Sequence, residues 1–577
     1  MISSRFKNII ASDSNLEGRN CQVPTSASSV MERTLYDIAI VGSGIACSMT
    51  ICQLAERLKD TPLESKKLRI GIIEKEGEFW SGIPYGRRSV VGALAFQKLQ
   101  DFLDEPERTS YIEWLVANKH CWLKTLQEVG GPGAARWISD NHRYMEHGKW
   151  EELYLPRFLF GMYVSSRAAR ALDELSNNSL ATVTLIHGEA TGISRGPGSS
   201  YTITVEGDGG VRISLNAERV VLAIGSPPQR SVHTGAVASQ RNHTHIDDLY
   251  SPSEEISVQR IHQALSSLPD KKMANILILG SNASSLEVLY LINYRSEIRK
   301  LINSVVVLSR SGLLPYKICE ETVQFELTAL ESLRQSGSFS ADDLIAAVTF
   351  DIQRAAGLKL NIADLRNAVG ALVGQLIGLM DISEQEKFIC RHGFNFSKMM
   401  RRAGRDTRDA ADELASLGIL TVVKGQFHRL EPSRSGNGLV SATYAGPECQ
   451  GDVTHPVPFS LTINCGGFEE LDVCSSQLIN SLIDSGLCKV NSTNRGFLVN
   501  DRLEASKNLY VIGPLVGGNF NDKVRFWHVE IATRIAGLSK MLAESLSHSL
   551  FLPSEYNFLD TNIPADVVGS GAYSPYL

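Results

Sequence analysis

Two glycines separated by a serine follow a short apolar run near the start of the chain, in the stretch YDIAIVGSGIACS of residues 36–48. Residues 38–41 have the length and branched side chains of a buried parallel strand, and a helical pattern begins directly after the second glycine. Glycine lets the backbone approach a ligand closely, and the free N–H groups at a helix N-terminus attract an anion. The spacing therefore predicts a turn that binds a pyrophosphate. Its residues are Gly42, Ser43, Gly44, Ile45 and Ala46.

An acidic residue ends the next apolar run, in the stretch KLRIGIIEKEG of residues 67–77. A carboxylate at the end of the second strand of such a unit accepts hydrogen bonds from an adenosine ribose. We therefore expect Glu74 and Lys75 to border the adenosine half of the ligand. Two later apolar runs also end in glycine, at Gly225 and at Gly513-Pro514, and we assign these residues to the same binding site.

A second strand, turn and helix follow in ANILILGSNASSLEVLYLI, residues 274–292. Gly280 opens this turn, and Asn282 stands where a second glycine is expected. Asparagine is the residue other than glycine that best tolerates a positive φ. The next run ends in Ser309 and Arg310, followed by another serine. An arginine and hydroxyls in place of a carboxylate suit a ribose 2′-phosphate, so this second turn predicts NADPH rather than NADH.

Residues 319–418 carry helical rather than strand-like patterns and predict an all-helical insert. Within it, Lys398, Arg401, Arg402 and Arg405 recur at helical steps and would form one cationic stripe. Such a stripe receives an anionic substrate or a cofactor phosphate, or it is a solvated face neutralised by neighbouring aspartates. The sequence leaves both interpretations open.

Composition excludes several classes of function. The chain has 577 residues and a formal net charge of −6, without a polybasic run, which gives no case for nucleic acid. We find no continuous apolar span or secretory signal, so we expect a cytoplasmic protein without a membrane partner. Ten cysteines without a CxxC pair indicate reduced thiols, and no metal centre is predicted. Cys47 and Cys52 would point roughly 140° apart on one helix, which favours packing over a redox pair.

Eight short motifs in this chain together resemble the flavoproteins with two dinucleotide-binding domains. Within that group they are similar to the FAD/NAD(P)-binding family related to flavin-dependent N-hydroxylating monooxygenases. The motifs are, in order, VGSGIACS, GIPYG, FLDEPERTSYIEWL, YLPRFLFGMY, VVLAIGSPP, VVVLSRSGLLP, INCGGFEE and LYVIGPLVGG.

The resemblance implies an α/β fold with two Rossmann-like dinucleotide-binding domains, in which an inserted NADPH domain splits the FAD domain. The FAD-binding domain would comprise residues 34–235 and 455–548, and the NADPH-binding domain residues 236–454 with the helical insert at about 319–418. Residues 1–33 would form a disordered extension and residues 549–577 a C-terminal tail.

The resemblance also implies a residue beside the flavin. The stretch LAFQKLQDFLDEP looks like the segment in which ornithine and lysine N-hydroxylases place a glutamine next to the reacting flavin carbon, so Gln97 is the catalytic candidate. Those enzymes carry a substrate-binding lysine a few residues later, where this chain has Gln100-Asp101-Phe102, so ornithine and lysine are not the expected substrates. The segment THIDDLYS, with Tyr250 at its seventh position, resembles an interdomain segment of the family or is an ordinary polar linker.

Three functions are compatible with these observations. The resemblance favours a monooxygenase with FAD and NADPH as cofactors, which N-hydroxylates a small amino-acid-like molecule with O2 through a flavin hydroperoxide. A second possibility is an oxidoreductase that uses both cofactors without inserting oxygen. A third is a flavin-binding sensor or scaffold with a degenerate NADPH site, which Asn282 would suggest. A homo-oligomer is compatible with each of the three.

Overall fold

The computed structural model of the chain describes residues 34–59, 67–232, 235, 237, 239–321, 323–446 and 451–551. The predicted N-terminal extension, and the predicted tail from residue 552 onwards, lie outside this range. The chain forms two compact units, each of which is described by itself. Among the described residues, unit 1 comprises those within 34–82, 161–227 and 470–551, and unit 2 those within 83–160 and 228–469.

Unit 1 contains a six-stranded sheet in the order β19-β20-β8-β2-β3-β4. Its strands are β2 (Ile38–Val41), β3 (Leu68–Glu74), β4 (Ala181–His187), β8 (Val220–Leu222), β19 (Glu504–Ser506) and β20 (Leu509–Val511). Strand β2 pairs in parallel with both β3 and β8, and its four residues are all buried. An apolar run of this length therefore forms the centre of a parallel sheet, as the sequence predicted.

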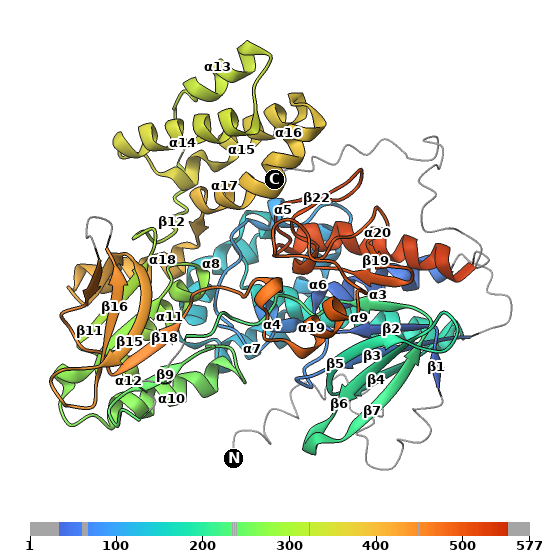
Figure 1. Cartoon of the computed structure of the whole chain (residues 1–577), viewed down its shortest axis with the longest axis horizontal. Helices are drawn as coiled ribbons and strands as arrows, with labels where there is room; N and C mark the ends of the chain where they lie inside the picture. The colour runs from blue at the N-terminus through green and yellow to red at the C-terminus, as the bar shows by residue number, and fades with distance from the viewer. Residues whose placement is uncertain are drawn as a thin grey trace. The chain divides into compact units, whose positions relative to one another are not determined.

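Helices, a second sheet and the short strand pair β21-β22 complete unit 1 (Figure 1). Helix α3 (Ile45–Lys59) follows β2 and packs against α20 (Ala532–Phe551). The second sheet has the order β1-β7-β6-β5, and helix α19 packs against β5. The remaining elements are β1 (Leu35–Tyr36), β5 (Glu189–Arg195), β6 (Tyr201–Glu206), β7 (Arg212–Ala217), α19 (Gln477–Asp484), β21 (Asn519–Phe520) and β22 (Arg525–Phe526). Helix α9 (Arg157–Asn177) begins in unit 2 and continues in unit 1.

Unit 2 is built on a five-stranded parallel sheet in the order β14-β11-β10-β18-β9. Its strands are β9 (Thr244–Ile246), β10 (Asn275–Leu279), β11 (Ser304–Ser309), β14 (Leu420–Lys424) and β18 (Leu461–Asn464). The predicted FAD-binding segment 455–548 starts before β18, but β18 pairs with β10 in the sheet of unit 2. A short apolar strand carries no local signal for the sheet it joins, so the sequence did not show that β18 pairs with β10.

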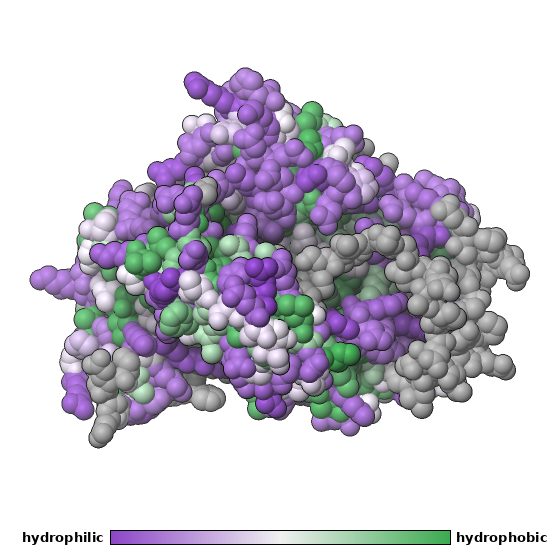
Figure 2. Space-filling view, turned by 90° about the horizontal axis from the view of Figure 1, so that it is seen from above, coloured by the Kyte–Doolittle hydropathy of each residue, from purple (hydrophilic) through white to green (hydrophobic). Residues whose placement is uncertain are grey.

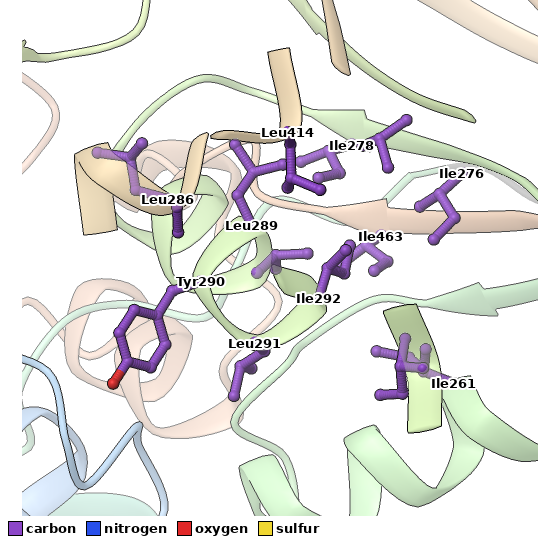
Figure 3. Packing of buried hydrophobic residues seen from close by; sticks show 14 of the residues in the cluster. Ile261, Ile276, Ile278, Leu286, Leu289, Tyr290, Leu291, Ile292, Leu414 and Ile463 are labelled. Carbon is purple, nitrogen blue, oxygen red and sulfur yellow. The ribbon is translucent and has the colours of Figure 1, made fainter. Parts of the chain in front are cut away.

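Alternate residues of this sheet face two different layers. On one face, Ile276 and Ile278 of β10 pack with Leu286 and Leu289 of α11 (Ala283–Tyr294), together with α10 (Glu254–Ser266) and α18 (Arg405–Ser416) (Figure 3). On the other face, the intervening residues of β10 and β11 pack against an antiparallel sheet. That sheet consists of β15 (Gln426–Pro432), β16 (Val440–Ala445) and β17 (Asp452–Thr454).

The residues between β11 and β14 contain a group of helices (Figure 1). These are α13 (Thr328–Ser336), α14 (Ala341–Gly357), α15 (Ile362–Leu379), α16 (Ile382–Lys387) and α17 (Gly393–Met399). Helix α14 begins with a capping box, in which Ser340 and Asp343 satisfy each other's backbone N–H groups. Further short elements are β12 (Tyr316–Lys317), β13 (Arg402–Ala403) and α12 (Ser296–Arg299). Helix α18 packs against α11 and so belongs to the parallel sheet layer, although the predicted insert extended to residue 418.

The segment 83–160 of unit 2 is also mainly helical. Its helices are α4 (Gly82–Tyr85), α5 (Leu99–Phe102), α6 (Glu107–Ala117), α7 (Lys119–Val129) and α8 (Gly131–Glu146). Trp122 of α7 is fully buried, and its ring packs edge to face against Trp137 and Trp150 at centroid distances of 6.5 and 6.2 Å. Aromatic pairs in this geometry stabilise a core beyond the area that they bury.

Helix α15 is, within the part of the chain that the structure describes, the one helix long and apolar enough to cross a membrane. Its mean hydropathy over 18 residues is 1.2, and half of that window is buried inside the protein. A core helix of a soluble protein passes the same test. The molecular face shown in Figure 2 is mainly hydrophilic, with hydrophobic residues in small separate groups.

Candidate functional site

The first glycine turn has the geometry that its sequence predicted. Gly42 has φ +91°, and a Cβ there would lie 2.5 Å from the carbonyl oxygen of Ala223 on the neighbouring strand. Its N–H donates to the carbonyl of Ile73 on the other side, at 2.8 Å. Gly44, in contrast, would place a Cβ 3.4 Å from the Cα of Gly82, an ordinary contact distance. Gly42 is therefore required by the fold, and Gly44 leaves space at the start of α3.

Several glycines border the N-terminus of α3, where Ile45 and Ala46 form the first turn. The N–H of Trp80 donates to the Ser43 carbonyl at 2.8 Å, which holds the following Gly82 against Gly44. Gly513, with φ +88°, would place a Cβ 3.9 Å from the Ala46 side chain, and Pro514 begins a single 3₁₀ turn. Unit 1 therefore brings Gly513 to this turn. No atom lies within 4 Å of a Cβ built at Gly225, whose φ is +79°.

The carboxylate of Glu74 lies beside the same turn. One of its oxygens accepts from the backbone N–H and the hydroxyl of Ser43, at 3.0 and 2.7 Å. The other accepts from the N–H of Glu76 at 3.0 Å. Lys75 is exposed, and its ammonium pairs with Glu76 and Glu189 at 4.0 and 3.9 Å rather than with a residue of the turn. A pyrophosphate thus fits beside the glycines of the turn, and a ribose fits beside Glu74.

The second glycine turn, in unit 2, repeats the first. Gly280 has φ +100°, and a Cβ there would lie 2.2 Å from the carbonyl oxygen of Cys465. Its N–H donates to the Leu308 carbonyl at 2.9 Å, as that of Gly42 donates to Ile73. In each sheet, the strand before the turn has a parallel neighbour on both sides. The glycine of the turn donates to one neighbouring strand and contacts the end of the other. The chain carries the same dinucleotide-binding geometry twice.

The backbone conformation of Asn282 differs from the predicted one. Its φ is −96°, in the extended region, so tolerance of a positive φ does not explain the asparagine. The residue precedes the first turn of α11 without capping it, and its side-chain oxygen is buried without a hydrogen-bond partner among the described residues. An unpartnered amide at the start of a dinucleotide helix offers a polar contact to a ligand.

The end of β11 carries hydroxyls where β3 carries a carboxylate. The Ser311 hydroxyl lies 3.4 Å from those of Ser281 in the turn and Ser309 on the strand. Arg310 is exposed, and the structure shows no ion pair for it within the described ranges. In unit 1 the equivalent serine contacts Glu74. The two turns therefore present different groups to a ribose, which suits two different dinucleotides.

Gln97 precedes α5 and lines a cavity of unit 2. Its amide donates to the Asp101 carbonyl at 3.1 Å. The cavity is small, about 10 Å³, which is room for about one water molecule, and Arg157 is the charged residue in its wall. The rest of the wall is apolar or aromatic and includes Leu99, Phe102 and Phe160. A cavity of this size does not hold a substrate, so the role of Gln97 beside a flavin stays a prediction.

Comparison with known proteins identifies the family. The uncharacterized proteins Rv3403c of Mycobacterium tuberculosis and Mb3437c of Mycobacterium bovis are each 46% identical over 517 residues, which cover 89% of this chain and 96% of each relative. Residues 39–227 match the profile of the FAD-NAD(P)-binding family. The chain belongs to this family of flavoproteins.

Solved structures show the same fold for the flavoprotein. The reduced form of the ornithine hydroxylase PvdA from Pseudomonas aeruginosa superimposes with a TM-score of 0.53 at 10% identity, over 90% of this chain and 100% of that chain. DfoA bound to FAD, a cadaverine monooxygenase from Erwinia amylovora, gives a TM-score of 0.53 at 12% identity, over 93% and 100%. The predicted α/β fold with two dinucleotide-binding halves is confirmed, and the family match confirms the prediction of FAD and a nicotinamide cofactor.

A buried charge network in the flavoprotein was missed from its sequence. The Arg157 guanidinium donates to Glu287 of α11 at 2.5 Å, and the Tyr250 hydroxyl donates to the other oxygen of Glu287 at 2.6 Å. Burial, reinforced by Glu287, raises the pKa of Tyr250. Desolvation disfavours the charged form of Arg157, and the nearby Glu287 carboxylate favours it. The net effect is a raised pKa of Arg157. Both charges interrupt apolar runs, LPRFLF and SLEVLYL, which is the signal that sequence reasoning had available.

The segment THIDDLYS does more than connect domains. Its first three residues form strand β9 at the edge of the unit 2 sheet, and its seventh residue, Tyr250, joins the network around Glu287. His245 lies 3.3 Å from Asp247, and burial lowers the pKa of His245.

The predicted cationic stripe does not form on one helix. Lys398 lies on α17, Arg402 on strand β13, and Arg405 begins α18 after an extended glycine. Arg405 donates to the carbonyl groups of Ile318 and Cys319, so it stabilises the connection before α13. The prediction that these residues share one helical face was wrong, because α17 ends at Met399, before Arg401.

The cysteine pair of the first helix carries no disulfide. Cys47 and Cys52 are both buried on α3, and neither forms a disulfide. Burial raises the pKa of Cys47 well above its usual range, which leaves it protonated and unreactive at neutral pH. In the described residues, no group of three or more His, Cys, Asp or Glu side chains is arranged to hold a metal ion.

Proposed function

We propose that this flavoprotein is an NADPH-dependent monooxygenase that hydroxylates the nitrogen of a small amino-acid-like substrate. The observation that carries the proposal is the pair of glycine turns with unlike partners, Glu74 beside one and Ser309 to Ser311 beside the other. Support comes from the fold, which spans the full length of an ornithine hydroxylase and a cadaverine monooxygenase. The protonated, buried Cys47 disfavours disulfide reduction.

In this proposal the two turns hold the two cofactors. Residues 42–46, with Glu74, Gly225 and Gly513, bind FAD, and the turn from Gly280 to Asn282, with Ser309 and Arg310, binds NADPH. When bound, the reduced flavin supplies the activation of O2. Gln97 orients the amine through its side-chain amide, and the apolar residues beside it, such as Leu99 and Phe102, keep water from the reacting oxygen.

Arg310 is expected to distinguish NADPH from NADH. Its guanidinium is exposed, and no ion pair engages it among the described residues, so it is available for the 2′-phosphate. Loss of one charged hydrogen bond costs roughly 1.5–3 kcal/mol, so Arg310→Ala should raise the KM for NADPH about tenfold or more and leave that for NADH nearly unchanged. Steady-state kinetics with both cofactors measure this. Arg434→Ala, another exposed arginine of unit 2, is the control, and equal effects on both cofactors would contradict the assignment.

The reaction itself is tested by anaerobic reduction with NADPH, followed by admission of air in the presence of an amine. We expect bleaching of the flavin absorbance and then a hydroxylamine product. Reduction followed by reoxidation without product for every amine tried would favour an oxidoreductase without oxygen insertion. No reduction at all would favour a flavin-binding sensor.

Replacing Gln97 tests the same reaction at the oxygen stage. Gln97→Ala should bind FAD and accept electrons from NADPH at a near-normal rate, and then release hydrogen peroxide instead of hydroxylated product, because the amine is no longer held in place. The exposed neighbour Gln100 provides the matched control, Gln100→Ala. Parental coupling in Gln97→Ala would remove Gln97 from the reacting site.

A further inference from the structure

Gln97 lies on one of two chain segments of unit 2 that are paired with each other. These are residues 93–99 and residues 153–157, which run antiparallel at the bridge between Leu94 and Pro156. Two backbone hydrogen bonds of 2.9 and 3.0 Å also join them, from Ala95 to Leu155 and from Leu99 to Leu153. Gln97 stands between these two hydrogen bonds, so both segments determine where its side chain lies.

A single carboxylate contacts both segments. The Oε1 atom of Glu320 accepts a hydrogen bond from the Tyr154 hydroxyl at 2.5 Å and one from the Lys98 ammonium at 3.2 Å. Tyr154 belongs to the second segment, and Lys98 directly follows Gln97 on the first. Glu320 therefore joins the two segments one residue after Gln97.

The Glu320 carboxylate is ionised at neutral pH. Desolvation raises its pKa, but the hydrogen bonds from Tyr154 and Lys98 outweigh this effect, and the net pKa is lowered. A nitrogen of Arg405 lies 3.6 Å from the other carboxylate oxygen. The side chains of Lys98 and Glu320 are 29% and 31% exposed, so water screens this ion pair less than it screens a pair on the open surface.

The backbone of Glu320 is fixed from the opposite side. Its φ is +62°, a conformation that a residue with a Cβ keeps only where its surroundings hold it. The carboxylate of Asp364, in the first turn of α15, accepts from the N–H groups of Glu320 and Cys319 at 2.9 and 3.3 Å. Arg405, at the start of α18, donates to the Cys319 carbonyl at 2.9 Å. These contacts direct the Glu320 side chain.

Glu320 stands where the chain enters the group of helices α13–α17. Strand β12, just before it, pairs with β13, where the chain leaves these helices. The N–H of Ile318 extends this pairing with a hydrogen bond of 3.1 Å to the Ala403 carbonyl. Both ends of the helical group therefore meet at this loop. Through Glu320, the loop is connected by hydrogen bonds to the segment that carries Gln97.

We propose that Glu320 is a positioning residue, which holds Gln97 in the orientation that couples NADPH oxidation to hydroxylation and makes this coupling depend on helices α13–α17. This inference rests on the proposed function, in which Gln97 orients the amine. Without an oriented amine, NADPH, a proton and O2 give NADP+ and hydrogen peroxide. Glu320 acts through Gln97, so its removal has no further effect on coupling once Gln97 is absent.

Hydrogen exchange of the FAD-loaded protein, followed by mass spectrometry, tests the connection without any substrate. Glu320→Ala should speed the exchange of the backbone amides in residues 93–99 at least about tenfold, because charged hydrogen bonds to this segment are lost. Tyr154→Phe removes one of these hydrogen bonds from the other side, leaves the loop of Glu320 intact, and should speed the same amides less. Glu321→Ala, at the exposed neighbouring residue, is the matched control. Unchanged exchange in both Glu320→Ala and Tyr154→Phe overturns the inference.

Turnover with L-ornithine, L-lysine and cadaverine as probe amines tests the effect on the reaction. Glu320→Ala should keep the parental FAD content and rate of reduction by NADPH, and release at least about threefold more hydrogen peroxide per NADPH. The double variant Q97A/E320A should release no more than Gln97→Ala. A slower reduction, or additive effects of the two substitutions, would indicate a general structural role and overturn the inference. If the parent protein hydroxylates none of the probes, the proposed function fails for them, and the exchange measurement still decides whether Glu320 holds the segment of Gln97.

Discussion

Gly44→Val is expected to purify as a folded protein with about a tenth or less of the parental FAD. Gly44 stands at the start of α3, where a Cβ would meet only Gly82, at 3.4 Å. The fold therefore tolerates a Cβ at this position. The branched side chain of valine, however, would extend into the space at the helix N-terminus where a pyrophosphate binds.

Flavin absorbance per protein, together with the thermal unfolding of the variant, measures this effect. Gly537→Val is the matched control, because a Cβ built at Gly537 of α20 in the same unit meets no atom within 4 Å. Gly44→Ala provides a smaller step at the same position. Parental FAD content in Gly44→Val would show that the cofactor does not approach this turn.

Gly280→Ala is expected to destabilise unit 2 by more than about 3 kcal/mol. A Cβ at Gly280 would lie 2.2 Å from the backbone carbonyl of Cys465, so either the turn or strand β18 must move. The backbone φ of +100° adds strain of roughly 1–2 kcal/mol for any residue with a Cβ. Both costs fall on the central strands of the parallel sheet.

The two costs are separated with Gly337→Ala. Gly337 ends α13 with φ +71°, but no atom lies within 4 Å of its Cβ position. Its substitution carries the conformational cost alone, roughly 1–2 kcal/mol. Urea unfolding of both variants and the parent measures the difference. If Gly280→Ala and Gly337→Ala unfold at the same urea concentration, the contact with Cys465 is not a constraint on this turn.

Local requirements were predicted from the sequence. Residues 38–41 form β2 as expected, and both Gly42 and Gly280 adopt positive φ values at the ends of apolar strands. The sequence also showed that a carboxylate ends β3, whereas serines stand at the end of β11. In the structure Glu74 contacts Ser43 of the first turn, and Ser311 contacts Ser281 of the second. Such features are predictable because strand, turn and helix are neighbours along the chain.

The sequence by itself therefore determined that this chain builds two dinucleotide-binding turns, since each depends on a few consecutive residues. The tertiary structure alone decided that β18 joins the sheet of unit 2, that Asn282 is extended, and that Arg157 meets Glu287 across 130 positions of the chain. A four-residue apolar strand does not encode its neighbour, and a charge within an apolar run does not encode its partner. Packing selects both, because burying a charge is tolerated only where the fold brings an opposite charge to it.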